Sequence, residues 1–309
     1  MPKDPNFSGV IAPVLTPFGE DGGPDAERFV EHCHWLMAEG CTGLAPFGTT
    51  SEGNSLGVDE RMELLEELVD DGMEAGVLMP GTGSCSLADA IVLTKHAVDM
   101  GCGGVLMLPP FYYKGLSDEG LFRSFAEVIE RVGDSRLRVY VYHIPPVAQV
   151  PITLGLVERL LKTYPTQVAG MKDSSGDWNN TQAFLEAFAP SGFDVFAGSE
   201  TFLLRNMRGG GKGCISATAN VNPGPIAHLY DTWKNENADY QQAQLDEIRT
   251  IFASFPMIPA LKAAVAHYGS DAGWGTVRPP LVALTREQAG SLVTQLDAKR
   301  FNMPGLGTH

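Results

Sequence analysis

The sequence is poor in positive charge and has no long apolar run. It contains 22 Lys and Arg against 37 Asp and Glu, which gives a formal net charge of −15. Such an acidic surface repels nucleic acid and anionic lipid, so we expect neither as a partner. No run approaches the roughly 20 consecutive apolar residues of a membrane helix, so we also expect no membrane span.

Paired cysteines and clustered histidines are also missing. The five cysteines lie far apart without a Cys-x-x-Cys pair, which argues against a disulfide framework or a structural zinc site. The seven histidines show no pair at metal-ligand spacing, and we expect no metal. Residues 1–25 lack the basic start and apolar stretch of a signal peptide. These absences predict a soluble cytoplasmic protein.

The sequence does contain a regular alternation of short apolar runs and longer amphipathic segments. Apolar runs typical of buried strands occur at residues 10–15, 42–45, 77–79, 105–108, 137–142, 168–172, 195–197 and 213–216. Such strands, alternating with helices, are typical of a parallel sheet covered by helices. The eight runs lie within about 220 residues and predict a (β/α)8 TIM barrel. An open doubly wound sheet would show a glycine-rich turn after its first strand, and Leu15-Thr16-Pro17-Phe18 is no such turn.

Strand character stops near residue 223. Helical patterns continue, at residues 226–234, 240–252, 258–268 and 287–299. We therefore expect a barrel over residues 1–222 and a C-terminal helical extension over residues 223–309. The extension is expected to pack on the barrel and not to form an independent domain.

The active site of a barrel lies at the carboxyl ends of its strands, and Lys172 is the strongest candidate there. It ends the apolar run Val168–Met171, so its side chain should emerge from a buried sheet. Burial favours the neutral amine, which can attack a ketone and form a Schiff base. The alternative from this segment alone is a lysine held by a salt bridge at a strand end.

Hydroxyl groups at the same rim strengthen the catalytic interpretation. Thr49 and Thr50 stand on a turn of small residues whose backbone N–H groups are suited to a carboxylate. Tyr142 and Tyr113 are candidates to move protons to and from the reacting carbon. Glu52, at the end of the same turn, is either a catalytic base or an anchor at a helix start.

Several motifs together resemble one family. They are Gly48-Thr49-Thr50-x-Glu52, Tyr112-Tyr113, Tyr142-x-x-Pro145, Gly170-x-Lys172-Asp173-x-Ser175-Gly176 and Ile215-Ser216-Ala217-Thr218-Ala219-Asn220. In their order and strand positions they are similar to the dihydrodipicolinate synthase / N-acetylneuraminate lyase superfamily. The resemblance covers the chain from about residue 9 to the C-terminal helices.

The resemblance implies a mechanism and an assembly. Lys172 would form a covalent imine with pyruvate or another 2-oxo acid, without a further cofactor. Tyr142 would be the general acid/base, and Thr49 would link it to Tyr113 in a proton relay. Thr50 would hold the carboxylate of the 2-oxo acid. The tyrosine matching Tyr113 crosses into the neighbouring subunit's site in this family, which implies a tight dimer and a homotetramer built as a dimer of dimers.

Further positions at the rim are candidates for substrate binding. Gly198 directly follows the seventh expected strand and Ile215 lies near the end of the eighth, where a bound 2-oxo acid would lie. Ser199 and Glu200 follow directly and stand where family members bind the distal end of the substrate.

The sequence also departs from the synthase pattern. Dihydrodipicolinate synthases have an arginine five residues after the tyrosine that matches Tyr142, and it binds the carboxylate of the aldehyde partner. Val147 stands at that position here. The positions that match the allosteric lysine site carry Gly53, Val58 and Cys85 in place of the expected hydrogen-bonding groups. We therefore expect no feedback regulation by lysine.

We expect a Schiff-base-forming lyase that cleaves or dehydrates a 2-keto-3-deoxy sugar acid. It would need no metal, since the protonated imine takes up the electrons of the broken bond. One alternative is a dihydrodipicolinate synthase with an unusual carboxylate site. The other is a non-catalytic pyruvate-binding sensor on the same fold.

Overall fold

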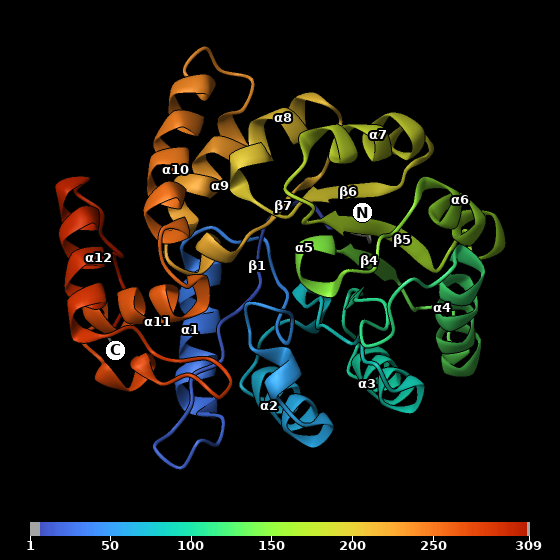
Figure 1. Cartoon of the computed structure of the whole chain (residues 1–309), viewed down its shortest axis with the longest axis horizontal. Helices are drawn as coiled ribbons and strands as arrows, with labels where there is room; N and C mark the ends of the chain where they lie inside the picture. Colours follow the sequence, from blue (N-terminus) through green and yellow to red (C-terminus); the bar gives the residue numbers. More distant parts are fainter. Residues whose placement is uncertain (1–6, 308–309) are drawn as a thin grey trace.

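The computed structural model describes residues 7–307 and contains one parallel sheet (Figure 1). Its strands pair in the order β2-β1-β7-β6-β5-β4-β3, and every pairing is parallel. The strands are β1 (Gly9–Ala12), β2 (Gly43–Leu44), β3 (Val105–Met107), β4 (Val139–His143), β5 (Val168–Asp173), β6 (Asp194–Ala197) and β7 (Gly213–Ile215). Each lies on one of the apolar runs of the sequence.

The two edge strands, β2 and β3, are joined by the segment that contains the remaining expected strand. Single parallel bridges connect Leu78 to Leu44 of β2 and Gly81 to Leu106 of β3. Backbone hydrogen bonds support both sides, from Met79 N–H to Leu44 O (2.8 Å) and from Thr82 N–H to Leu106 O (3.1 Å). Pro80 has no N–H to donate, so regular strand pairing is interrupted here. The segment nevertheless closes the ring, and the predicted TIM barrel is confirmed.

Helices surround the sheet on its outer face (Figure 1). Most follow a strand in sequence, as the hydrophobic patterns predict. They are α1 (Ala26–Ala38), α2 (Val58–Asp70), α3 (Leu87–Asp99), α4 (Asp118–Val132), α5 (Pro145–Ala148), α6 (Leu154–Thr163), α7 (Trp178–Phe188), α8 (Leu203–Arg208), α9 (Pro223–Thr232), α10 (Ala238–Ala253), α11 (Met257–Tyr268) and α12 (Arg286–Ala298).

Alternating residues of the strands build two separate cores. Val139 and Val141 of β4 face outward and pack with the helices. Tyr140 and Tyr142 of the same strand face inward and pack inside the barrel with Phe196 and other residues. The period of two that strand geometry imposes therefore divides each strand between the two cores.

The amino-terminal end of the barrel interior is filled by large side chains. Tyr140 is fully buried, and its hydroxyl donates to Asp194 Oδ2 at 3.1 Å. The ring of Phe7 packs edge-on against Tyr140, with the ring centroids 5.7 Å apart. Gly170 makes room for this packing, since a Cβ there would lie 2.7 Å from the Tyr140 ring. These residues plug the bottom of the barrel.

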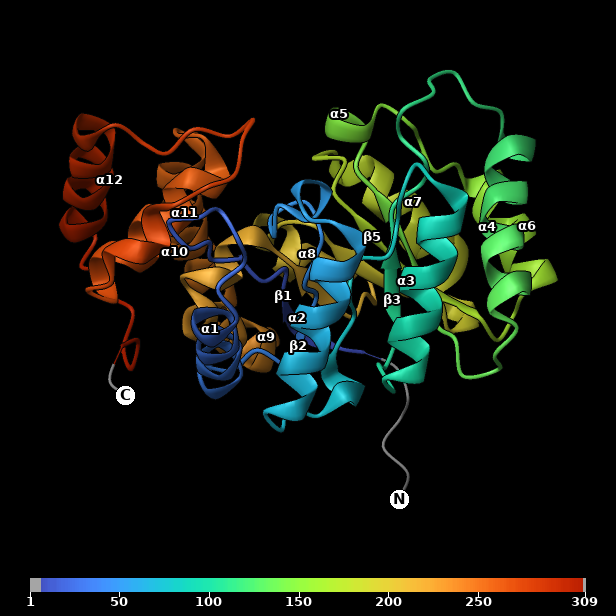
Figure 2. The ribbon, with the colours of Figure 1, turned by 90° about the horizontal axis from the view of Figure 1, so that it is seen from below.

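The last three helices form a group beside α1 and α9, on one side of the barrel (Figures 1 and 2). Helix α12 packs on both α10 and α11. The division of the chain at residue 222 stays a prediction, and residues 308–309 lie outside the described range. No single helix within residues 7–307 has the length and apolar character of a membrane span, although the bent pair α10 and α11 (106°) meets both criteria when taken together. The absence of a signal peptide from residues 1–25 also stays a prediction, and residues 1–6 lie outside the described range.

Candidate functional site

Strand pairing brings Tyr142 and Lys172 together at the carboxyl end of the barrel. They are direct partners in the parallel register of β4 and β5, and both side chains point into the barrel. The Lys172 ammonium lies 4.5 Å from the centroid of the Tyr142 ring. The pairing of β4 with β5 therefore sets the relative position of the two candidate catalytic groups.

Lys172 is buried, with 4% of its surface exposed. None of the ion pairs found among residues 7–307 includes it. The alternative of a lysine held by a salt bridge at a strand end is therefore not what the structure shows. A buried amine without a carboxylate partner, at the active end of a barrel, is suited to nucleophilic attack on a carbonyl.

Thr49 connects the turn after β2 to this pair. Its Oγ1 lies 3.2 Å from the Tyr142 hydroxyl, within hydrogen-bond distance, and either oxygen can be the donor. Thr49 and Tyr142 also line the same water-sized cavity of about 20 Å³ at the top of the barrel. Thr50 follows on the turn and is buried, with 9% exposure. Three of the predicted groups, Lys172, Tyr142 and Thr49, thus form one cluster.

The turn that carries Thr49 and Thr50 is bounded by two residues in the left-handed backbone conformation. Phe47 has φ 64° and Glu52 has φ 55°, a region that costs free energy for residues other than glycine. Glu52 is buried and forms an ion pair with Lys262 of α11 at 2.5 Å. It does not line the small cavity. Glu52 is therefore an anchor of the turn to the C-terminal helices, which neither sequence interpretation had specified.

Tyr113 stands away from the cluster in this chain. It is 70% exposed and lies in the segment between β3 and α4, with its ring packed edge-on against that of Tyr112 at 5.3 Å. Within residues 7–307 no hydrogen bond to its hydroxyl is found, so the expected relay through Thr49 is not formed inside one chain. Two neighbouring exposed tyrosines form an apolar projection suited to contact with another molecule.

The ends of β6 and β7 contain the remaining candidates. Gly198 lets β6 approach β5 closely: its N–H donates to Asp173 O at 2.7 Å, and a Cβ would lie 2.0 Å from Ser174 Oγ. Ile215 is fully buried in the interior core beside Tyr142. Ser199 is partly exposed, and its hydroxyl lies 2.9 Å from Thr201 Oγ1 at the start of a short helical turn.

Glu200 is buried, and its carboxylate binds groups of the chain itself. The hydroxyls of Ser216 and Thr218 donate to its two oxygens, and Arg249 Nη1 of α10 lies 3.2 Å from Oε2. Glu200 thus joins β6, the segment after β7 and α10. Both carboxylate oxygens of Glu200 therefore already have donors within the chain. The expected contact of Glu200 with substrate stays a prediction. Sequence reasoning did not identify Arg249, which lies far along the chain within an ordinary helical pattern.

A second pair lies directly behind Tyr142 and Lys172, on the outer face of the sheet. His143 and Asp173 are the next partners in the β4–β5 register. Asp173 accepts hydrogen bonds from three side chains, those of Ser175 (3.1 Å), Asn180 (3.0 Å) and Thr181 (2.6 Å). His143 Nδ1 accepts from the N–H of Ile152 at 2.9 Å. Burial lowers the pKa of His143, opposed by the nearby Asp173.

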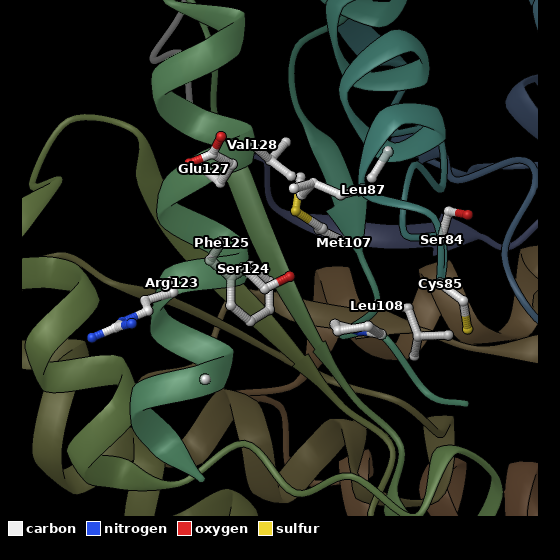
Figure 3. Close-up of a pocket in the computed structure, with 13 residues that line it drawn as sticks. Ser84, Cys85, Leu87, Met107, Leu108, Arg123, Ser124, Phe125, Glu127 and Val128 are labelled. Carbon is white, nitrogen blue, oxygen red and sulfur yellow. The ribbon is translucent and has the colours of Figure 1, made fainter. Parts of the chain in front are cut away.

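A larger cavity of about 340 Å³ lies outside this cluster (Figure 3). Cys85, which precedes α3, and Leu87, its first residue, border the cavity together with Phe125 and Val128 of α4. It contains none of the predicted catalytic residues. The size of a cavity therefore does not locate the chemistry in this protein, whereas the convergence of lysine, tyrosine and threonine does.

Comparison with known proteins agrees with this geometry. The family model described as "Dihydrodipicolinate synthetase family" matches residues 6–299. An uncharacterized DapA-like lyase of Chloroflexus aurantiacus is 34% identical over 92% of this chain and 94% of its own. Dihydrodipicolinate synthase from Agrobacterium tumefaciens superposes with a TM-score of 0.88 at 32% identity, covering 94% of this chain and 99% of its own. YagE, an Escherichia coli prophage protein of the dihydrodipicolinic acid synthase family solved with pyruvate, has a TM-score of 0.87 at 26% identity, covering 96% and 99%.

Fold, site and relatives define a class of enzyme. The protein is a TIM-barrel class I lyase, of the aldolase or dehydratase type. Within this class, the chain belongs to the dihydrodipicolinate synthetase family. The predicted resemblance is thereby confirmed over nearly the whole chain.

Proposed function

We propose that Lys172 forms a Schiff base with the carbonyl carbon of a 2-oxo acid. The observation that carries this proposal is the buried, unpaired amine of Lys172 beside a Tyr142 hydroxyl that is hydrogen-bonded to Thr49 at 3.2 Å. The same arrangement argues against a non-catalytic sensor, because a pyruvate-binding site has no need of a second hydroxyl positioned to exchange protons with the tyrosine. The enzyme would need no metal and no further cofactor.

The chemistry follows from the positions of these groups. The neutral amine adds to C2 of the 2-oxo acid, and Tyr142 supplies the proton with which the added oxygen leaves as water. The resulting protonated imine takes up the electron pair released when the bond between C3 and C4 breaks. For cleavage, a base accepts the proton of the C4 hydroxyl, and Tyr142 is the nearest group on this chain able to do so. Bond breaking leaves an enamine, and Tyr142 returns the proton to its C3, which regenerates the protonated imine. Addition of water to C2 of this imine then releases pyruvate and the free lysine.

For the substrate, we propose a 2-keto-3-deoxy sugar acid. The position at which synthases bind the aldehyde's carboxylate is Val147, an apolar side chain that is 62% exposed on α5. No arginine or lysine occurs between Arg138 and Arg159. A sugar acid has a single carboxylate, which Thr50 and the turn would bind, and it presents neutral hydroxyls to the rest of the site. Burying a second, unpaired carboxylate would cost several kcal/mol.

A dihydrodipicolinate synthase activity is the second candidate, and one observation favours it. Lys114 reaches across from the segment after β3, and its ammonium donates to Ala148 O at 2.7 Å and to Phe111 O. This places a cation next to Val147 that comes from a different part of the chain. Lys114 would have to exchange a backbone carbonyl for the carboxylate of aspartate semialdehyde.

We also propose an assembly and a location. The exposed Tyr112 and Tyr113 would pack against the same residues of a second subunit, and Tyr113 would complete the relay in the partner's site. Two such dimers would form the homotetramer. The cytoplasmic location expected from the sequence belongs to this proposal.

Borohydride trapping tests the covalent step. Incubation with pyruvate and borohydride should add a stable mass to the intact protein, and peptide mapping should place it on Lys172. Lys172→Ala should abolish the adduct and turnover while leaving the barrel folded. Lys162→Ala, which removes an exposed lysine on α6, is the matched control and should trap like the wild type. An adduct on another residue, or none, would overturn the proposal.

A kinetic comparison separates the candidate functions. The value of kcat/KM for cleavage or dehydration of 2-keto-3-deoxy pentonates and hexonates should far exceed that for condensation of pyruvate with aspartate semialdehyde. Efficient condensation that is lost in Lys114→Met would identify a synthase that uses Lys114. Trapping of pyruvate without turnover on any substrate of the panel would identify a sensor.

A further inference from the structure

A buried ion pair connects the carboxylate-binding turn to the C-terminal helices. Glu52 Oε1 lies 2.5 Å from the Lys262 ammonium, and the two side chains are 1% and 0% exposed. Glu52 stands two residues after Thr50, whereas Lys262 belongs to α11. Burial lowers the pKa of Lys262, and the Glu52 charge opposes this shift. Removing two charges from water costs free energy, which their mutual attraction offsets only when the geometry is good and further hydrogen bonds are made.

Each partner is held by further contacts. Lys262 Nζ also donates to Thr276 O at 2.8 Å, and the second Glu52 oxygen accepts from the N–H of Arg278 at 2.9 Å. The ring of Phe18 contacts both cations, with its centroid 4.3 Å from Lys262 Nζ and 4.6 Å from Arg278 Cζ. The Glu52 carboxylate is therefore held from two directions by groups of the C-terminal region.

The Arg278 side chain binds the segment that follows the turn. It forms two hydrogen bonds with Glu60 near the start of α2, at 2.7 and 2.5 Å, and one with Ser55 O at 2.8 Å. Arg278 thus contacts the chain on both sides of the 3-10 turn at Gly53–Ser55. Lys262 and Arg278 therefore contact the chain at several points between Glu52 and Glu60.

The Glu52 carboxylate is bound by groups of the C-terminal region, whereas local contacts hold the rest of the turn. Among these, the Arg61 side chain donates to Gly53 O in the turn. The backbone hydrogen bonds of the turn run from Glu52 N–H to Thr49 O (3.1 Å) and from Gly53 N–H to Gly48 O (2.9 Å). Thr16 contributes one further bond, to Ser51 O at 2.8 Å. Glu52 meanwhile occupies a left-handed conformation that a non-glycine residue adopts only under constraint. The ion pair with Lys262 acts on the side chain of this same residue and joins it to α11.

We infer that Glu52 and Lys262 are positioning residues for the reaction, and that α11 with the segment after it is part of the active-site machinery. They hold the backbone of the turn so that Thr49 meets Tyr142 and Thr50 meets the carboxylate of the 2-oxo acid. This inference rests on the proposed Schiff-base function. It assigns the C-terminal helices a role in substrate binding, beyond packing on the barrel.

Borohydride trapping at a series of pyruvate concentrations tests the inference, with the unfolding temperature measured in parallel. The variants are Glu52→Gln, Lys262→Met and the double variant. Each single change leaves one buried charge without its partner and should lower the unfolding temperature strongly. The double variant contains neither charge and should recover most of that loss. Its half-saturating pyruvate concentration should nevertheless stay roughly tenfold or more above the wild-type value, because small displacements of binding groups are costly.

A purely structural role would give a different result. In that case the half-saturating concentration would return to the wild-type value along with the unfolding temperature, and the inference would be overturned. Tyr140→Phe is the control, since it breaks the buried bond to Asp194 at the opposite end of the barrel. It should lower the unfolding temperature without changing half-saturation. If the wild type itself is not trapped, the proposed function fails and the inference fails with it, whereas trapping that is equal in wild type and double variant overturns the inference alone.

Discussion

Tyr142 owes its candidate role to neighbours on two different segments. The sheet register places it beside Lys172, and the turn after β2 brings Thr49 to its hydroxyl. A tyrosine at a strand end is more often an ordinary core residue. Tyr142 differs from such a residue because its hydroxyl lies within hydrogen-bond distance of the Thr49 hydroxyl, with which it can exchange a proton.

Tyr142→Phe should lower turnover by about 10²–10⁴-fold, the range typical of general acid/base catalysis. The change removes one oxygen and little volume, so the fold should persist. Pyruvate trapping should slow in parallel, since loss of water from the first adduct also needs a proton. Steady-state kinetics and trapping rates check this. Tyr240→Phe, at a 67% exposed site, is the matched control. A loss below about threefold, well under that range, would show that another group moves the proton.

His32 should make the fold sensitive to acid. It is 2% exposed, its Nε2 lies 3.3 Å from Asn220 Oδ1, and burial lowers its pKa from 6.5 to about 4. The folded state therefore keeps His32 neutral while the unfolded chain binds a proton below pH 6.5. Stability should be full above pH 6.5 and fall by about 3 kcal/mol as the pH drops towards 4.

Urea unfolding of the wild type and His32→Gln at pH 7 and pH 4.5 measures this contribution. Glutamine keeps a donor for Asn220 and does not titrate, so the variant should lose clearly less stability on acidification. Part of the acid sensitivity should persist, because burial also lowers the pKa of His143. Equal losses in the two proteins would exclude His32 as the source.

Sequence reasoning predicted the positions of single residues at the rim of the barrel, because those positions depend on the local pattern. Lys172 ends an apolar strand and Thr49 follows one, so a barrel places both at the same rim. It could not identify what Glu52 and Glu200 bind, because Lys262 and Arg249 come from distant helices. Neither helix differs in pattern from an ordinary amphipathic one. Long-range polar pairs of this kind depend on packing that no local motif records.

At the scale of the element, the ends of β4 and β5 place candidate catalytic side chains on one face of the sheet and structural side chains on the other. Tyr142 and Lys172 point into the barrel, while the next residues, His143 and Asp173, point towards the helices. Asp173 joins β5 to the start of α7 through Asn180 and Thr181. A change on the outer face should therefore reach the inner face through the backbone of the same strand.

Asp173→Asn should destabilise the protein by about 2–3 kcal/mol, since the amide leaves one or more buried donors unpaired. Asp177→Asn is the matched control: this exposed residue caps α7, and asparagine caps as well as aspartate. Chemical denaturation of the two variants gives the comparison. Similar stabilities would show that the carboxylate of Asp173 contributes nothing that an amide cannot replace.

The strands and helices were largely predictable, with one instructive exception. Hydrophobic periodicity indicated the positions of the strands and of the long helices, because alternating burial leaves a direct trace in the sequence. The run at 77–79 is the exception: Pro80 and Gly81 reduce this strand to single bridges. The barrel still closes there, so the count of eight units was a sounder guide to the fold than the regularity of any one strand.

At the scale of the whole molecule, the position of Tyr113 bears on assembly. In a single chain Tyr113 is 70% exposed at the surface, and its hydroxyl does not complete the relay. Its role in catalysis would therefore exist only in an oligomer. The sequence predicted Tyr113 as a candidate at the rim, whereas its contact with a second subunit was expected only from the family resemblance, since composition and periodicity describe one chain.

Tyr113→Phe and Tyr113→Ala should separate the two roles of this residue. Phenylalanine retains the ring, so the molecular mass in sedimentation should be unchanged while turnover falls by about 10²-fold, the lower end of the range for general acid/base catalysis. Alanine removes the ring and should both lower turnover and weaken association. Tyr112→Phe is the control and should behave like the wild type. Full turnover by a Tyr113→Phe variant would remove Tyr113 from the relay.

Within residues 7–307, Tyr140, Phe7 and Asp194 fill the amino-terminal end of the barrel interior, so we expect access to Lys172 from the carboxyl ends of the strands. Whatever reaches Lys172 must enter and leave through the mouth formed by the strand ends. In the proposed mechanism, the fragment bound to Lys172 would lie deepest, so the outer fragment would depart before it. In the reverse direction, the deep fragment would bind first. The proposed mechanism therefore predicts an ordered reaction, in which the fragment that binds last is released first. Product-inhibition patterns should reflect that order, with the aldehyde released before pyruvate.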